Sequence, residues 1–231
     1  MATYNGEKYI QKQLESILTQ IELDDEVIIS DDSSFDSTTN IIKAFNDKRI
    51  KLHEGQKFQS PIFNFENAIK LSKGDVIILA DQDDIWKSNK VDTIKKSMAN
   101  NERSLKMYNG NCIDGHDVVI KDDLFDYIGI SYGLLSNTRK NSFIGCNIAF
   151  NKELLEFILP FPKNIPMHDM WIGSCAYLFG RVEFVDEKIF SYRLHDNNFT
   201  GKKTSLINKI KWRFRLIKNL ITRYVHVKYF K

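Results

Sequence analysis

Apolar residues in the first half of the chain form short blocks whose spacing alternates between that of a helix and that of a strand. Within residues 7–20 the apolar side chains that share one helical face are Tyr9, Ile10, Leu14, Ile17 and Leu18. The same reading predicts helices at residues 63–72 and 90–100 and from about residue 37, and strands at residues 25–30, 50–53, 75–80, 106–111 and 118–120. Strands that alternate with helices in this way are typical of an α/β domain.

The second half of the chain contains apolar segments of both kinds after a loop-rich stretch at residues 122–141. We predict strands at residues 143–150, 182–185 and 189–193, and helices at residues 151–158, at 167–178 and from 202 onward. No repeat, low-complexity segment or linker is evident in the sequence. We therefore expect one α/β domain over residues 1–200 and a helical tail over residues 201–231.

The tail combines a regular apolar stripe with a strong positive charge. Its apolar residues recur at spacings of three and four, at Ile207, Ile210, Phe214, Ile217, Ile221 and Tyr224. Residues 202–231 hold ten Lys and Arg and no acidic residue, whereas residues 1–201 hold 23 basic and 30 acidic residues. A cationic amphipathic helix of this kind is typical of a membrane surface. Packing on its own domain and a homo-oligomer contact are the alternatives, and nucleic acid is not expected because no known binding module accompanies the charge.

Composition narrows the class of protein further. With 42% apolar residues and 12% aromatics, the chain can bury a sizeable core. The three cysteines are far apart and form no CxxC pair, which favours a reducing cytoplasm over a disulfide framework or a zinc site. No apolar run of about 18 residues and no signal peptide is present, so we expect a cytoplasmic protein. The sequence also lacks the glycine-rich motifs of dinucleotide-binding and P-loop proteins.

A cluster of carboxylates follows the apolar segment at residues 76–80. Its residues are Asp81, Gln82, Asp83 and Asp84, and Trp86 comes two positions later. Carboxylates this close repel one another unless they are exposed, protonated or bridged by a hard cation such as Mg²⁺ or Mn²⁺. The carboxyl end of a strand in an α/β sheet is also where ligands bind. We therefore predict a divalent metal site, with an ordinary acidic turn as the alternative.

Several dispersed motifs give the chain a resemblance to a known family. In order, they are Ala2-Thr3-Tyr4-Asn5-Gly6, Ser30-Asp31-Asp32-Ser33-Ser34, Gly74-Asp75 with Leu79 to Trp86, Phe143 to Asn147, Met167-His168-Asp169-Met170-Trp171, and Tyr192 to Asn198. Their order and spacing over residues 1–200 resemble those of family 2 glycosyltransferases. The variant with two carboxylates after Gln82 and then a tryptophan is most similar to bacterial rhamnosyltransferases of cell-surface polysaccharide synthesis.

The resemblance implies a fold and a set of roles. The fold would be GT-A, with a mainly parallel nucleotide-binding sheet flanked by helices. By the same resemblance Ala2, Tyr4 and Asp32 would contact the nucleotide, Asp81 would lie near the ribose, Asp83 would bind the metal, and Asp169 would be the catalytic base. His168 departs from the acidic residue that many relatives have before the base.

Four further residues complete the predicted site. His195 matches a histidine that in some relatives approaches the metal, with a hydrogen-bonded loop histidine as the alternative. Asp84 is predicted to contact the acceptor. Trp86 and Trp171 are predicted to contact it as well, because a flat ring suits the C–H-rich face of a sugar. Core packing is the alternative for Trp171. Relatives also have several apolar residues before the first motif, whereas here Met1 alone precedes it, so we expect a short first strand.

These features together predict an inverting, metal-dependent glycosyltransferase. It would move a hexose, in the first place L-rhamnose, from a dTDP or UDP donor to a hydroxyl of a surface glycan or a lipid-linked acceptor at the inner face of the cell membrane. A Mg²⁺-dependent haloacid-dehalogenase-like phosphohydrolase is an alternative, because it also has Asp-x-Asp after a strand. A nucleotide-sugar-binding protein without turnover is another.

Overall fold

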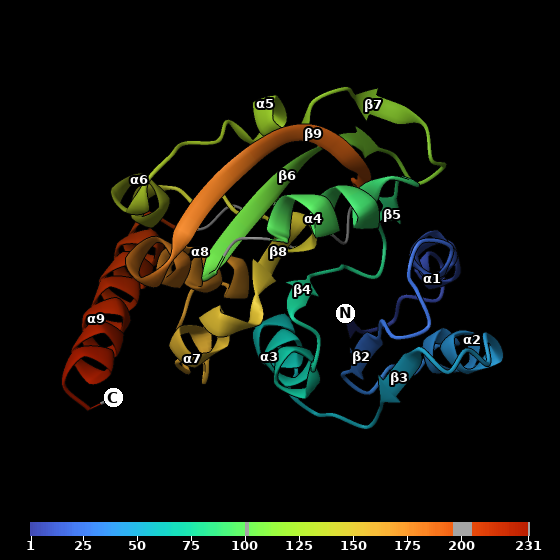
Figure 1. The fold of residues 1–231 in the computed structure, drawn as a ribbon, viewed down its shortest axis with the longest axis horizontal. Helices are drawn as coiled ribbons and strands as arrows, with labels where there is room; N and C mark the ends of the chain where they lie inside the picture. Colours follow the sequence, from blue (N-terminus) through green and yellow to red (C-terminus); the bar gives the residue numbers. More distant parts are fainter. Residues whose placement is uncertain (100–101, 196–204, 231) are drawn as a thin grey trace.

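A computed structural model describes residues 1–99, 102–195 and 205–230. The smaller of its two sheets is parallel, in the order β1-β2-β3, with the helices α1 and α2 in its connections (Figure 1). These elements span Ala2–Thr3 (β1), Ile10–Leu18 (α1), Val27–Asp31 (β2), Thr38–Ala44 (α2) and Ile50–His53 (β3). All five residues of β2 are buried, as expected for the middle strand of a parallel sheet.

The larger sheet has the order β4-β8-β6-β9-β5, with β7 paired to β6. Its strands are Val76–Ile78 (β4), Ile85–Trp86 (β5), Ser104–Ile113 (β6), Val119–Lys121 (β7), Ile148–Asn151 (β8) and Arg181–Arg193 (β9). Only the β6–β9 pair is parallel, and the other described pairs of this sheet are antiparallel. The α/β class predicted from the sequence is confirmed, but "mainly parallel" holds for the smaller sheet alone.

Helices cover both faces of the larger sheet, with α4 in front of it and α8 behind it in Figure 1. The remaining helices span Pro61–Leu71 (α3), Lys90–Met98 (α4), Leu124–Ile128 (α5), Leu134–Arg139 (α6), Leu155–Ile158 (α7), His168–Phe179 (α8) and Leu206–Phe230 (α9). The stretch predicted as loop-rich therefore contains α5 and α6, and the two strands predicted at residues 182–185 and 189–193 are the single strand β9. The boundary predicted near residue 200 lies outside the described residues.

Two hydrophobic clusters form the core. One joins α3, α7 and α8 to the larger sheet, and the other joins α1, α2 and α4 to both sheets. Leu216 and Leu220 of α9 belong to the first cluster and are 0% and 5% exposed, so α9 packs on the body of the protein. None of the described helices combines the length and the apolar run that crossing a bilayer requires.

Candidate active site

The acidic loop after β4 is fastened to the loop after β1. The Tyr4 amide donates to Gln82 Oε1 at 2.9 Å, and Gln82 Nε2 donates to the Tyr4 carbonyl at 3.1 Å. Gly6 permits this approach, because a Cβ there would overlap the Gln82 side chain. Gln82 is thus a positioning residue that the sequence analysis missed, although it lies inside the motif. The carboxyl ends of β1 and β4 meet at this point.

The end of β9 brings Arg193 and His195 to the same loop. His195 Nε2 lies 2.8 Å from Asp83 Oδ2, and the two side chains are only 17% and 16% exposed. The His195 ring stacks on Tyr9, with 5.3 Å between ring centroids. Arg193 donates from Nε to the Asp83 carbonyl at 2.6 Å and lies 4.5 Å from the centre of the Tyr9 ring. Residues from the start of α1 and the end of β9 therefore converge on the acidic loop at Asp83.

Asp84 points into the protein, away from any acceptor. It is 1% exposed, and its Oδ1 accepts a hydrogen bond from the Arg193 amide at 2.9 Å. Its Oδ2 finds no nitrogen or oxygen donor among the described residues. One ligand atom each from Asp81, Asp84 and Cys146 lie within 4.8 Å of one another. The predicted acceptor contact of Asp84 is therefore wrong, and its carboxylate instead faces Asp81 from the interior.

Burial and mutual repulsion make this cluster costly to ionise. Burial, together with the charges of Asp83, Asp84 and Asp169, raises the pKa of Asp81 well above its ordinary value. Burial and the neighbouring Asp83 raise the pKa of Asp84 to about 7. Lys90, a buried cation whose charge acts on Asp81 and Asp84, has its own pKa lowered to about 8 by burial. Additional positive charge near Asp81 and Asp83 would relieve this repulsion.

The residues present fit a divalent cation. Asp83 and Asp81 are only partly buried, so their carboxylates can reach an ion at the edge of the sheet. Carboxylate oxygens are the ligands that Mg²⁺ and Mn²⁺ prefer. The ring nitrogen of His195 already lies against Asp83 and could complete such a site.

Asp169 lies in the first turn of α8. Its Oδ1 accepts hydrogen bonds from Asn141 Nδ2 at 3.0 Å and from the Met170 amide at 2.6 Å. Burial outweighs these hydrogen bonds and raises the pKa of Asp169 to about 7. Its charge also contributes to the raised pKa of Asp81, which places the two carboxyl groups in one electrostatic environment. Asn141 is a second positioning residue that the sequence analysis missed, because no motif contains it.

His168 is held by packing. Its ring is 6% exposed and stacks on Phe65 with 4.1 Å between centroids, and neither ring nitrogen has a hydrogen-bond partner in the described chain. A Cβ on Gly145 would lie 2.6 Å from its Nε2, so the glycine leaves room for this ring. Burial lowers the pKa of His168 to about 3, and the ring is therefore neutral at ordinary pH.

The predicted nucleotide contacts occupy the ends of β1 and β2. Asp32 is 8% exposed and accepts hydrogen bonds from the amides of Phe58 at 2.6 Å and Ser60 at 3.1 Å. Tyr4 is 53% exposed and meets the exposed ring of Phe35 edge to face at 6.2 Å. Ala2 is partly buried against the core. Tyr4 is thus open to a ligand, whereas the Asp32 carboxylate holds the loop at residues 58–60.

Both tryptophans predicted to contact the acceptor are buried. Trp171 is 0% exposed, and its Nε1 donates to the Ile158 carbonyl at 2.8 Å. Trp86 is 6% exposed, and Lys90 Nζ lies 4.4 Å from its ring centre. Neither ring presents a face on which a sugar could stack, so the predicted contact is wrong for both, and core packing is the correct alternative for Trp171.

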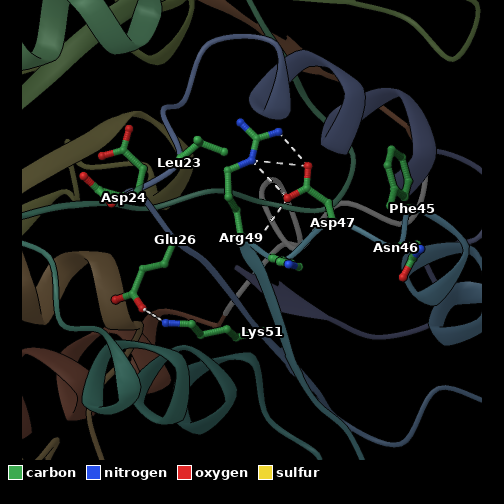
Figure 2. A pocket seen from close by; sticks show the side chains of 10 residues that line it. Leu23, Asp24, Glu26, Phe45, Asn46, Asp47, Arg49 and Lys51 are labelled. Atoms are coloured by element: carbon green, nitrogen blue, oxygen red, sulfur yellow. Dashed lines mark hydrogen bonds and ion pairs between the residues drawn. The ribbon is translucent and has the colours of Figure 1, made fainter.

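A sizeable hollow lies away from this site. Its volume is about 860 Å³, and its lining is Leu23, Asp24, Asp25, Glu26, Phe45, Asn46, Asp47, Lys48, Arg49 and Lys51 (Figure 2). All of these residues except Lys51, which lies in β3, precede β2 or β3, so the hollow is at the amino ends of the parallel strands. Ligands of open α/β sheets bind at the carboxyl ends. Three of the four carboxylates of the hollow are also paired: Asp25 with Lys95, and Asp47 and Glu26 in the Asp47–Arg49 and Glu26–Lys51 contacts that Figure 2 shows.

Comparison with known proteins assigns the chain to a family. The sequence model described as "Glycosyl transferase family 2" matches residues 1–159. The chain belongs to glycosyl transferase family 2. It is a glycosyltransferase, and the phosphohydrolase alternative is therefore wrong.

Two named relatives of this glycosyltransferase cover most of the chain. A dTDP-rhamnosyl transferase, RfbG of Shigella flexneri, is 31% identical over 95% of the chain and 79% of its own length. A glucosyltransferase of Escherichia coli named for UDP-Glc and α-D-GlcNAc-diphosphoundecaprenol, WfgD, is 29% identical over 70% of the chain and 62% of its own length. These matches support the predicted membership in polysaccharide synthesis.

Solved structures confirm the GT-A type of fold. S. aureus TarS, residues 1–349 in complex with UDP-GlcNAc, gives a TM-score of 0.70 at 17% identity over 99% of the chain and 71% of that protein. The mannosyltransferase PcManGT of Pyrobaculum calidifontis, in complex with GDP-Man and Mn²⁺, gives 0.67 at 16% identity over 97% of the chain and 67% of that protein. Identities this low support the fold alone.

Proposed function

We propose that this glycosyltransferase is inverting and metal-dependent, and that it moves L-rhamnose from a dTDP donor to a hydroxyl of a surface glycan or lipid-linked acceptor. The observation that carries the proposal is the Asp83–His195 pair in the acidic loop, beside an Asp81 carboxyl whose pKa is raised by burial and by charges that include that of Asp169. Burial raises the pKa of Asp81 and of Asp169, so both carboxyl groups can hold or release a proton near neutral pH more readily than ordinary aspartates.

Asp83 and His195 would hold Mg²⁺ or Mn²⁺, and Asp81 and Tyr4 would contact the nucleotide. When bound, the ion would supply positive charge opposite the diphosphate as the glycosidic bond breaks. Tyr9 and Arg193 keep Asp83 and His195 in place by stacking and hydrogen bonding, so the pair is organised before the donor arrives.

Asp169 would act as the base. The acceptor oxygen attacks the anomeric carbon, its proton passes to the Asp169 carboxylate, and the bond to the diphosphate breaks on the opposite face, which inverts the centre. A pKa of about 7 suits this role near neutral pH, because the group is then ionised often enough to act and basic enough to accept the proton. Asn141 fixes the carboxylate by its hydrogen bond to Oδ1.

The donor and acceptor are proposed by analogy with the named relatives. RfbG is named for dTDP-rhamnosyl transfer and covers nearly the whole chain, which supports a dTDP donor ahead of a UDP donor. WfgD is named for a diphosphoundecaprenol acceptor, which supports a lipid-linked glycan. We accordingly propose that the enzyme works in the cytoplasm, peripherally on the inner face of the cell membrane.

A donor panel tests the proposal. Nucleotide release would be measured with dTDP-rhamnose, UDP-glucose and GDP-mannose, each with Mn²⁺, with Mg²⁺ or with chelator, over a set of glycan acceptors. We expect nucleotide release with one of the donors, and we expect the chelator to abolish it. Asp83→Ala should weaken metal-dependent donor binding, whereas Asp169→Asn should bind donor and fail to transfer. Donor binding without transfer by the wild-type chain over the whole acceptor set would favour a non-catalytic protein instead.

A further inference from the structure

Helix α9 carries two apolar stripes, of which one is buried against the protein and the other is largely exposed. The packed stripe contains Leu216, Leu220 and Val227. Arg223 lies on the same side and donates to the carbonyls of Phe157 at 2.5 Å and Leu159 at 2.8 Å. These contacts fix the rotation of α9 about its axis, and therefore also fix which residues it turns outward.

The stripe noticed in the sequence is the outward one. Its members are between 44% and 72% exposed, at Ile207, Ile210, Phe214, Ile217, Ile221 and Tyr224. At 3.6 residues per turn this stripe is centred roughly 120° around the helix from the packed one. Figure 1 shows α9 at one end of the molecule, with α6 and α8 on its inner side. A continuous row of large exposed apolar residues is unusual on a soluble protein surface and marks an interaction site.

Positive charge borders the outward stripe. Lys211, Arg215 and Lys218 are all exposed along one side of it, and α9 contains no acidic residue. A partner that covers this face must therefore offer both negative charge and apolar depth. A second copy of the chain would bring another cationic helix against this one, and like charges would oppose the contact. Anionic phospholipid offers both features.

We propose that the outward face of α9 is a docking surface for membranes that contain anionic phospholipid. The helix would lie in the plane of the interface, with Phe214, Ile217 and Ile221 below the headgroups and the neighbouring Lys and Arg side chains among the phosphates. This inference goes beyond the reaction, because lipid binding needs neither donor nor metal.

Docking would also orient the active site. The guanidinium of Arg223 lies 5.3 Å from the centre of the Trp171 ring, two residues from Asp169. Further along, Tyr224 stacks on Phe179 at 6.2 Å. Helix α8, which begins next to the candidate base, is therefore attached directly to the docking helix. The orienting role rests on the proposed function, whereas lipid binding does not.

Vesicle flotation of the whole chain, without donor or metal, tests the proposal. We expect flotation with vesicles of phosphatidylcholine and phosphatidylglycerol, and little with phosphatidylcholine alone. Replacing Lys211, Arg215 and Lys218 by Gln should weaken binding about a hundredfold, because each charge near the surface contributes about fivefold. High salt should weaken the wild type in the same direction.

Apolar variants complete the test. Phe214→Gln, Ile217→Gln and Ile221→Gln together should abolish flotation, because glutamine keeps helix propensity but not apolar depth. The matched control is Leu23→Gln, which removes an apolar residue that is 91% exposed in the connection between α1 and β2. Circular dichroism should show unchanged helix content in all variants.

Three results would overturn the proposal. They are no flotation of the wild type, unchanged flotation of the triple variant at Phe214, Ile217 and Ile221, or a dimer that forms without lipid in sedimentation and is absent in this triple variant. Transfer to a water-soluble acceptor is expected to be unchanged in the triple variant. If the wild type does not transfer sugar to such an acceptor, the proposed reaction is contradicted, but the conclusion about lipid binding is unaffected.

Discussion

Acidic side chains gather at both ends of the parallel sheet, but their surroundings differ. At the amino ends of the strands each of Asp25, Glu26 and Asp47 has a basic partner, at 2.9 Å, 2.7 Å and 2.6 Å respectively. Hydrogen bonds from Arg49 lower the pKa of Asp47 to about 2. Partial burial opposes the effect at Glu26, but the bond from Lys51 still lowers its pKa. These carboxylates are charged and satisfied.

At the carboxyl ends the balance is reversed. Burial dominates, and the pKa values of Asp84 and Asp169 are both raised to about 7. Arg193 is the arginine nearest to Asp83, and its guanidinium donates to backbone carbonyls and to Asp117. Carboxyl groups whose pKa values are raised by burial are typical of a functional site. The comparison shows that the pairing of the acidic residues identifies the catalytic edge more reliably than the presence of a large hollow.

The largest expected effect is that of Asp169→Asn. If Asp169 is the base, transfer should fall by roughly a hundred- to ten-thousandfold while donor binding is retained, because the amide cannot accept the proton. Nucleotide release at saturating donor and calorimetric donor affinity would measure the two quantities. Asp47→Asn, at the opposite end of the sheet, is the matched control and should transfer at the wild-type rate. Equal rates for the two variants would remove Asp169 from the mechanism.

Asp83→Asn should act on binding. Without this direct ligand, the increase in donor affinity that Mn²⁺ causes should be about a hundredfold smaller. Removing a residue that only hydrogen-bonds a metal ligand already lowers metal affinity about 10- to 100-fold. Donor titrations with Mn²⁺ and with chelator would show this. Asp25→Asn, which removes a paired carboxylate, should leave the metal effect intact. If both variants respond to Mn²⁺ like the wild type, the ion is held elsewhere.

The pH profile should separate the two ends of the sheet. Asp169 must be ionised to act, so transfer should fall about tenfold per unit as pH drops below about 7. The same raised pKa means that the folded state holds a proton that the unfolded state has lost, so this group costs stability as pH rises from about 4 towards 7. A rate that is flat from pH 5 to pH 8 would contradict the assignment.

The smallest effect is expected for Asp47→Asn on stability. Because the folded-state pKa of Asp47 is lowered to about 2, its ion pair stabilises the fold above the ordinary carboxyl range and loses that effect as pH falls towards 2. The variant should melt slightly below the wild type at pH 7, and the gap should narrow between pH 4 and pH 3. Thermal melts followed by circular dichroism would detect this. A difference in melting temperature that grows as the pH falls would contradict the predicted direction of the effect.

The sequence predicted the regular elements where local pattern determines them. The strand at residues 50–53 and the helix beginning at residue 90 lie where expected, because apolar spacing and capping are local signals. Strand pairing in the larger sheet was not predictable. Its strands pair with partners far away in sequence, such as Leu105 with Val182, and no local pattern encodes that choice.

The candidate site was predicted in part. The meeting of Asp83 with His195 follows from motifs that the resemblance supplied, and the structure places them 2.8 Å apart. The exposure of the aromatic side chains was not predictable, because an aromatic residue next to an acidic motif can face the solvent or the core. Trp86 and Trp171 both face inward, where Lys90 and Arg223 lie over their rings. Gln82 and Asn141 were missed because hydrogen bonds between distant loops leave no pattern in one sequence.

The most direct test of the contrast between the two ends is a carboxyl titration by carbon-13 NMR. Aspartate labelled at Cγ would be followed from acid to neutral pH, with Asp169→Asn and Asp47→Asn used for assignment. We expect a midpoint near 7 for Asp169 and near 2 for Asp47. If Asp169 and Asp47 both titrated in the ordinary carboxyl range near 4, the claim that carboxyl pKa values are raised at the catalytic edge and lowered at the opposite end would be contradicted.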